Sequence, residues 1–252
     1  MEWRDEGVIL SARRHGESSV ILEVLTKTHG RHAGVVRGGA SRKLAPVLQP
    51  GNQVEVEWRA RLEEHLGGFH VELLHSRSAI MGDRAALAAL GSICALGGFA
   101  LPERMELPEI YQRTIDLVDA LETGQGWQAD YAIWELRLLE ELGYGLDLGS
   151  CAATGSTQEL IYVSPKSGRA VSRSSGAAYA DRMLPLPVFL QLEGAEAESP
   201  EILDALKTTG YFLERWLAPA LGNRPLPEAR GRLVHLLARR AKKDAAEDSG
   251  TG

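Results

Sequence analysis

The hydrophobic period of this chain changes once, near residue 80, and that change limits the folds open to it. Before it, apolar residues alternate with polar ones or form short runs, which is the pattern of β-strands. After it, apolar residues recur every three or four positions over helix-length segments. We therefore expect an α+β protein, in which an N-terminal β-domain is followed by a mostly helical domain.

The first domain, residues 1–78, contains five short strand-like segments. They are 7–10, 20–25, 32–36, 54–59 and 69–73, and turn residues such as glycines separate them. Five strands in so short a stretch are typical of a small closed barrel, and the OB-fold is one such barrel. OB-folds bind single strands of nucleic acid repeatedly, so we expect an OB-fold nucleic-acid-binding domain.

The second domain, residues 79–244, contains five helix-length segments, at 80–98, 108–122, 129–142, 199–219 and 227–243. An insert at about 146–185 interrupts it. There, two strand-like pieces flank a Ser-Pro-Lys-Ser-Gly sequence that predicts a hairpin turn. Residues 245–252 are small and acidic, and we expect a disordered tail there.

Charge and cysteine content suggest a cytoplasmic protein. The net charge is −6 and the isoelectric point is about 5.7, which is unusual for a nucleic-acid binder. The acidity belongs to the part after residue 80, because the first domain is nearly balanced. Two isolated cysteines do not form a disulfide framework, and residues 85–101 are too rich in Ala and Gly for a membrane span. We expect a cytoplasmic protein without a membrane contact.

Basic residues at the predicted turns of the first domain are the stronger functional signal. Arg37, Arg42 and Lys43 flank the loop Gly38-Gly-Ala-Ser41, where glycine permits close backbone approach and paired cations can meet successive phosphates. An ordinary charged surface is the alternative. The candidate DNA-binding residues are Arg13, Arg14, Lys27, Arg31, Arg37, Arg42 and Lys43. A possible secondary DNA-binding set shares one face of the last predicted helix and comprises Arg232, Arg239 and Lys243.

Catalytic and metal-binding patterns are missing. The chain has no P-loop, no G-x-S-x-G and no H-E-x-x-H motif, so we expect a protein that is not an enzyme and has no catalytic residues. Six of seven histidines lie in the first 80 residues, but their spacing does not gather enough ligands for a zinc site, and turn-exposed histidines are the simpler interpretation. Trp3 or Phe69 could stack bases, although a buried core position is the alternative for Phe69.

Three later segments carry a family resemblance. They are WELRLLEELGYGLDL from Trp134 to Leu148, LPLPVFL from Leu184 to Leu190 and TGYFLERWLAPAL from Thr209 to Leu221. Together with the order of domains, they resemble the RecO family of bacterial recombination mediators. The resemblance implies a protein of the RecF pathway that binds and anneals single- and double-stranded DNA. It also implies partnership with RecR and with the C-terminal tail of single-strand binding protein, and help in loading RecA.

The insert departs from the family pattern. RecO-like proteins often carry two C-x-x-C pairs, whereas here Cys151 is followed by Thr154, and Ser172 and Ser175 stand at the places of the later pair. A structural zinc ion needs four ligands, so we expect a degenerate zinc knuckle with no metal and no cofactor. Packing of residues such as Leu160 would then hold the hairpin together with Tyr162 and Val171.

Two other functions remain open from the sequence. An RNA- or ribosome-associated OB-fold protein would share the barrel, and a phosphoesterase with an unrecognised carboxylate site would be an enzyme.

A receptor for the acidic, apolar-ended tail of single-strand binding protein needs a hydrophobic groove flanked by cations. Three cations on predicted helices adjoin apolar residues and are candidates: Arg113 beside Ile110 and Leu117, Lys207 beside Leu203, and Arg215 beside Tyr211 and Phe212.

Overall fold

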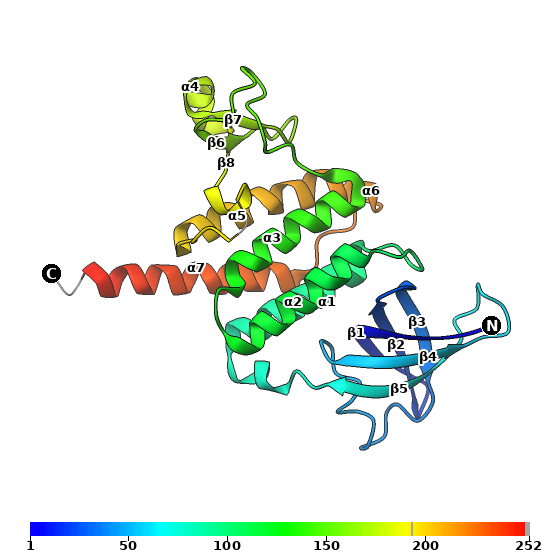
Figure 1. Ribbon diagram of the computed structural model, residues 1–252. Helices are drawn as coiled ribbons and strands as arrows, with labels where there is room; N and C mark the ends of the chain where they lie inside the picture. The colour runs from blue at the N-terminus through cyan, green and yellow to red at the C-terminus, as the bar shows by residue number, and fades with distance from the viewer. Residues whose placement is uncertain (193, 250–252) are drawn as a thin grey trace. The chain divides into compact units, whose positions relative to one another are not determined.

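The computed structural model describes residues 1–192 and 194–249, and these residues form two compact units (Figure 1). The first unit comprises Met1–Gln125 and Pro227–Arg230. The second comprises Gly126–Leu226 and the chain from Gly231 onward. The first unit contains a β-barrel and the second is mostly helical, so the expected α+β class is confirmed.

The barrel has the five expected strands, β1 (Glu2–His15), β2 (Ser19–Thr26), β3 (Gly30–Val36), β4 (Gln53–Arg59) and β5 (Gly68–His75). They close in the order β1-β2-β3-β5-β4. All neighbours are antiparallel except β3 and β5, which meet in parallel through the pair Val35 and Gly68. β1 is longer than its apolar run predicts because its first half pairs with β4 and its second half with β2.

Alternating side chains fill the barrel. Val54, Val56 and Trp58 of β4 are buried, while the intervening glutamates face outward. Phe69 of β5 is also buried, which confirms the core alternative for this residue. The β3–β4 connection folds into consecutive turns and places Leu48 in the same core.

Two helices complete the first unit. A short 3₁₀ segment, η1 (Ser78–Gly82), leads into α1 (Arg84–Ala100), and α2 (Pro108–Thr123) follows. The Asp83 carboxylate caps α1 by accepting from the backbone N–H groups of Ala85 and Ala86. α1 packs against β1, where Cys94 Sγ lies 3.6 Å from the Ile9 carbonyl. The first unit therefore extends beyond residue 78. Over the described residues, no helix is long and apolar enough to cross a membrane.

The second unit is built around α3 (Trp127–Leu139) and α5 (Ser199–Phe212), which pack together. Tyr131, Trp134 and Leu138 are buried, as their spacing predicts. Between the helices lies a buried carboxylate, Glu135, which accepts from Tyr131 Oη at 2.8 Å and from Thr209 Oγ1 at 2.5 Å. These hydrogen bonds satisfy oxygen atoms that would otherwise be costly to bury.

Most of these helices end where the sequence predicts. α3 runs into the π-turn η2 (Glu140–Tyr144), where Gly143 has φ of +83° and stops the helix as expected. α5 continues through η5 (Leu213–Leu217) and α6 (Ala218–Ala220). α7 spans Glu228–Ser249, so residues 245–249 are helical where we expected disorder. Residues 250–252 of that expected tail lie outside the described residues.

The insert contains the expected hairpin, made by β6 (Leu160–Val163) and β7 (Ala170–Ser172). A third strand, β8 (Leu184–Pro185), pairs with β6. Two short helical segments, α4 (Arg173–Gly176) and η3 (Ala177–Arg182), connect β7 to β8, and a third, η4 (Val188–Leu190), follows β8. Leu160 and Val171 are buried and Tyr162 is half-buried, which agrees with a hairpin that is held by packing.

The residues that the sequence assigns to a degenerate knuckle adjoin one another. Cys151 Sγ accepts from the Ser172 backbone N–H at 3.3 Å and lies 3.4 Å from Ser172 Oγ, which is 3.1 Å from Ser175 Oγ. Hydrogen bonds from Ser172 and Thr154 lower the pKa of the Cys151 thiol to about 5. In the described part of the chain, no three His, Cys, Asp or Glu side chains gather as a metal site would require.

Candidate nucleic-acid interface

One end of the barrel gathers most of the predicted DNA-binding residues. The strand register sets Arg14 opposite Val20, and Val20 opposite Val36, so the β1–β2 turn and the end of β3 lie side by side. The β3–β4 connection joins them, because the Ala40 N–H donates to the Ser18 carbonyl at 3.0 Å. We call this surface the cationic end, and it comprises Arg13, Arg14, Arg37, Arg42 and Lys43.

The side chains of the cationic end are available to bind an anion. All five residues are exposed, and none forms an ion pair with any other residue that the structure describes. The connecting segments 16–18 and 37–52 contain one carboxylate, that of Glu17. The cationic end is therefore locally positive in a protein that is acidic overall.

A groove of about 680 Å³ adjoins Arg37 on the barrel wall, where the β-pairing of β3 with β5 is limited to one residue pair. It also contains Arg59 and His70, which sequence analysis did not select. The alternation in β4 shows that Arg59 faces outward, but only the strand pairing places it near Arg37. Arg59 forms ion pairs with Glu2 and Glu57, so it is partly neutralised.

Two predicted DNA-binding residues lie elsewhere. Lys27 is exposed in the β2–β3 turn, at the opposite end of β2 and roughly 25 Å from the cationic end at about 3.3 Å per residue. Arg31 bonds to Glu23 at 2.7 Å, to the Leu101 carbonyl at 2.7 Å and to Glu103 at 3.5 Å. Its side chain is only 13% exposed, so its position favours a structural role over a DNA contact.

The possible secondary DNA-binding residues lie on α7, but in two different surroundings. Arg232 and Arg239 are exposed on this helix. Lys243 instead lines a hollow of about 630 Å³ in the second unit, together with Arg240 and Asp244. The hollow's apolar wall comes from Ile202, Leu203 and Leu237.

The structure does not place the candidate grooves for the tail of single-strand binding protein where the sequence predicts them. Ile110 and Leu117, beside Arg113, are core residues, and so is Phe212 beside Arg215. Leu203 does line a groove, but the cations there are Arg240 and Lys243 rather than Lys207.

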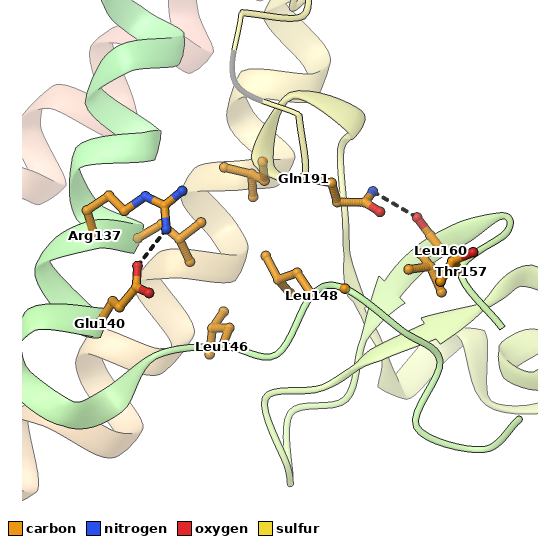
Figure 2. A pocket seen from close by; sticks show the side chains of 10 residues that line it. Arg137, Glu140, Leu146, Leu148, Thr157, Leu160 and Gln191 are labelled. Carbon is orange, nitrogen blue, oxygen red and sulfur yellow. Dashed lines mark hydrogen bonds and ion pairs between the residues drawn. The ribbon is translucent and has the colours of Figure 1, made fainter. Parts of the chain in front are cut away.

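A second hollow in this unit, of about 310 Å³, lies between α3 and the insert (Figure 2). Leu136, Leu146 and Leu148 are among its apolar residues. Its cation, Arg137, bonds to Glu140 at 2.6 Å. The cation of this hollow is therefore already paired within the protein.

Histidine burial also differs from expectation. His32 is 4% exposed in β3 rather than exposed in a turn, because it faces the barrel interior. His29 does lie in the β2–β3 turn, where its Nδ1 is 2.9 Å from Asp5 Oδ2. The spacing of these residues in the sequence could not reveal which strand face His32 occupies.

Comparisons with known proteins cover almost the whole chain. Residues 1–77 match the family model for the N-terminal part of recombination protein O, and residues 81–225 match the model for its C-terminal part. A DNA repair protein RecO of Ruegeria sp. (strain TM1040) is 59% identical over 95% of this chain and 100% of its own length. RecO proteins of Cereibacter sphaeroides (strain ATCC 17029) and Dinoroseobacter shibae are 58% and 54% identical, each over 95% of this chain and 99% of their own.

Two models of one family thus match most of the chain, and the relatives match over nearly their full lengths. The chain belongs to the RecO family of DNA repair proteins.

Proposed function

We propose that this protein binds DNA through the cationic end of its barrel and anneals complementary strands as a recombination mediator of the RecF pathway. The observation that carries the proposal is the gathering of five exposed cations without ion-pair partners among the described residues, on a barrel of an otherwise acidic chain. The RNA- or ribosome-associated alternative has no support in the relatives' names. The protein would act in the cytoplasm, associated with the nucleoid.

Annealing by such a surface needs no covalent chemistry. Two single strands repel each other through their phosphates, and a protein that neutralises both lowers that barrier. Base edges must remain free to pair, so contacts to phosphate serve this purpose better than contacts to base edges. The mechanism uses no catalytic residue, metal or cofactor.

The test is the annealing rate of two complementary oligonucleotides with a triple variant, Arg37→Glu, Arg42→Glu and Lys43→Glu. A matched control reverses three exposed cations of the insert, Lys166→Glu, Arg173→Glu and Arg182→Glu, and changes the net charge equally. We expect the first variant to lose both binding and annealing and the control to keep them. Equal losses in both would reduce the effect to net charge and contradict the assigned surface.

We further propose that the hollow lined by Leu203, Leu237 and Lys243 receives the acidic tail of single-strand binding protein. Apolar residues of α5 and α7 would take the terminal apolar side chain, and Arg240 and Lys243 would face the acidic residues. RecR and RecA complete the partners that family membership suggests. The protein would help to load RecA after it has bound single-stranded DNA that is coated with single-strand binding protein.

A labelled acidic peptide with an apolar last residue tests this groove. Arg240→Glu with Lys243→Glu should weaken binding, whereas Arg137→Glu in the hollow of Figure 2 should leave it unchanged. Removing the last apolar residue of the peptide should abolish binding. If the shortened peptide binds equally well, the contact is nonspecific charge attraction and the groove assignment fails.

A further inference from the structure

A hollow of about 600 Å³ opens in the first unit beside the β2–β3 turn. Aromatic residues from three strands and the turn line it, namely Trp3, His29, His32 and Trp58. The polar groups around it have both signs, with Arg104 and the amino terminus of Met1 as donors and Glu2, Glu63 and Glu106 as acceptors. It lies beyond the far end of β2 from the cationic end, so the proposed phosphate surface does not account for it.

The aromatic residues form an ordered stack. The His29 ring lies parallel to Trp3, with ring centroids 4.1 Å apart and planes 9° apart. Trp3 in turn stacks on Trp58 at 5.6 Å. Asp5 fixes the turn end of this stack by bonding both His29 and Thr28. Trp58 is fully buried but Trp3 and His29 are half-buried, so the stack extends from the core to the hollow.

His32 is the unexplained member of this wall. Its ring is roughly perpendicular to those of Trp3 and Trp58, with ring centroids 5.0 and 4.8 Å apart, and neither ring nitrogen has a hydrogen-bond partner among the described residues. Burial lowers the pKa of His32 to about 4, so at neutral pH the ring carries one N–H donor and one acceptor. A leucine would fill a purely structural position without leaving polar atoms unpaired.

We propose that this hollow takes one nucleobase of a bound DNA strand. The base would stack on His29, at the exposed end of the stack, and small movements of the half-buried Trp3 and His29 would let its edge reach the imidazole of His32. Any base has a face that stacks on an aromatic ring, whereas three carboxylates against two cations in the hollow do not favour a phosphate. Lys27, exposed next to Thr28 of the rim, would meet the adjoining phosphate.

This inference rests on the proposed DNA binding and adds a base contact to it. It also explains the place of Lys27, which the cationic end leaves isolated. A strand held by one base here and by phosphates at the cationic end would follow the barrel along the length of β2, and the bases between these points would remain free to pair.

The test compares two oligonucleotides of equal length, one of thymidines and one of abasic residues, which carry the same phosphates. The wild-type protein should bind the thymidine strand more tightly by about 5- to 150-fold, the contribution expected of one stacked base. Trp3→Ala and His32→Leu should each reduce that ratio toward one. The variant Arg37→Glu, Arg42→Glu and Lys43→Glu should weaken both oligonucleotides and keep the ratio.

The thermal stability of a His32 variant distinguishes a role in ligand binding from a role in the hydrophobic core. His32→Leu should unfold at the same or a higher temperature than the wild type because it removes two unpaired polar atoms. If that variant does not fold, half-buried Trp3 still tests the pocket through Trp3→Ala. A ratio of one in the wild type, or a ratio unchanged in the variants that fold, would overturn the base pocket while leaving DNA binding by the cationic end intact. Failure of the wild type to bind either strand would instead refute the proposed function, and the pocket with it.

Discussion

Replacing Arg31 with methionine should destabilise the first unit without weakening DNA binding. The guanidinium joins β2 to the segment after α1 through Glu23 and the Leu101 carbonyl, and the side chains of Arg31 and Glu23 are only 13% and 15% exposed. Breaking a fully buried pair costs about 3–5 kcal/mol, whereas an exposed pair contributes about 0.2–1 kcal/mol. With this partial exposure we expect a loss of about 2–3 kcal/mol in the free energy of unfolding.

Thermal unfolding followed by circular dichroism measures this loss. A decrease of about 4–12 °C in Tm corresponds to it at roughly 2–4 °C per kcal/mol for a protein of this size. Arg31→Met with Glu23→Gln should recover part of the stability, because the second change removes the stranded carboxylate charge. Oligonucleotide affinity, measured well below the transition, should not change. An unchanged Tm together with reduced affinity would refute the reasoning and return Arg31 to the DNA contacts.

Three further predictions concern the knuckle and the barrel core. The pKa of Cys151 in the folded state is about 5, below its ordinary value. The thiolate should therefore stabilise the fold fully above about pH 8.5, and this stabilisation should disappear as the pH falls toward 5. Denaturant unfolding at several pH values should show this decrease in the free energy of unfolding in the wild type and not in Cys151→Ser. A chelator should leave the Tm of the wild type unchanged. Thr154→Cys, Ser172→Cys and Ser175→Cys together should create a protein that binds one zinc ion, and metal analysis that finds no zinc would contradict the expectation that these four positions can form a zinc site. Gly34→Ala should lower the free energy of unfolding by about 1–3 kcal/mol, because the added carbon would lie 2.6 Å from the Phe69 ring. Gly91→Ala, in open space on α1, should raise it by about 0.5–1 kcal/mol. Equal effects of the two variants in unfolding experiments would contradict the packing argument.

The strands and helices were predictable because each has a local cause. The alternation from Val54 to Arg59 marks one barrel strand, and prolines at the start of α2 and α5 mark helix ends. The tail was predicted less well. Residues 245–249 continue α7, since composition alone does not show where a helix stops.

The candidate site depended on pairing that no local pattern contains. Residues 13 and 14 meet residue 37 only through the register of β1, β2 and β3, and the same register carries Lys27 to the other end. Arg31 looked like any other turn cation until the structure placed Glu23 beside it. His32 could not be distinguished from an exposed histidine because its burial depends on rings contributed by three other strands.

The cationic end itself is tested most directly by the salt dependence of single-strand binding. Each neutralised phosphate contributes about 0.7 to the slope of log affinity against log salt, so the variant Arg37→Glu, Arg42→Glu and Lys43→Glu should lower the magnitude of that slope by about 2. The insert variant Lys166→Glu, Arg173→Glu and Arg182→Glu should keep the wild-type slope. An unchanged slope in the barrel variant would contradict our account and move the phosphate contacts elsewhere on the molecule.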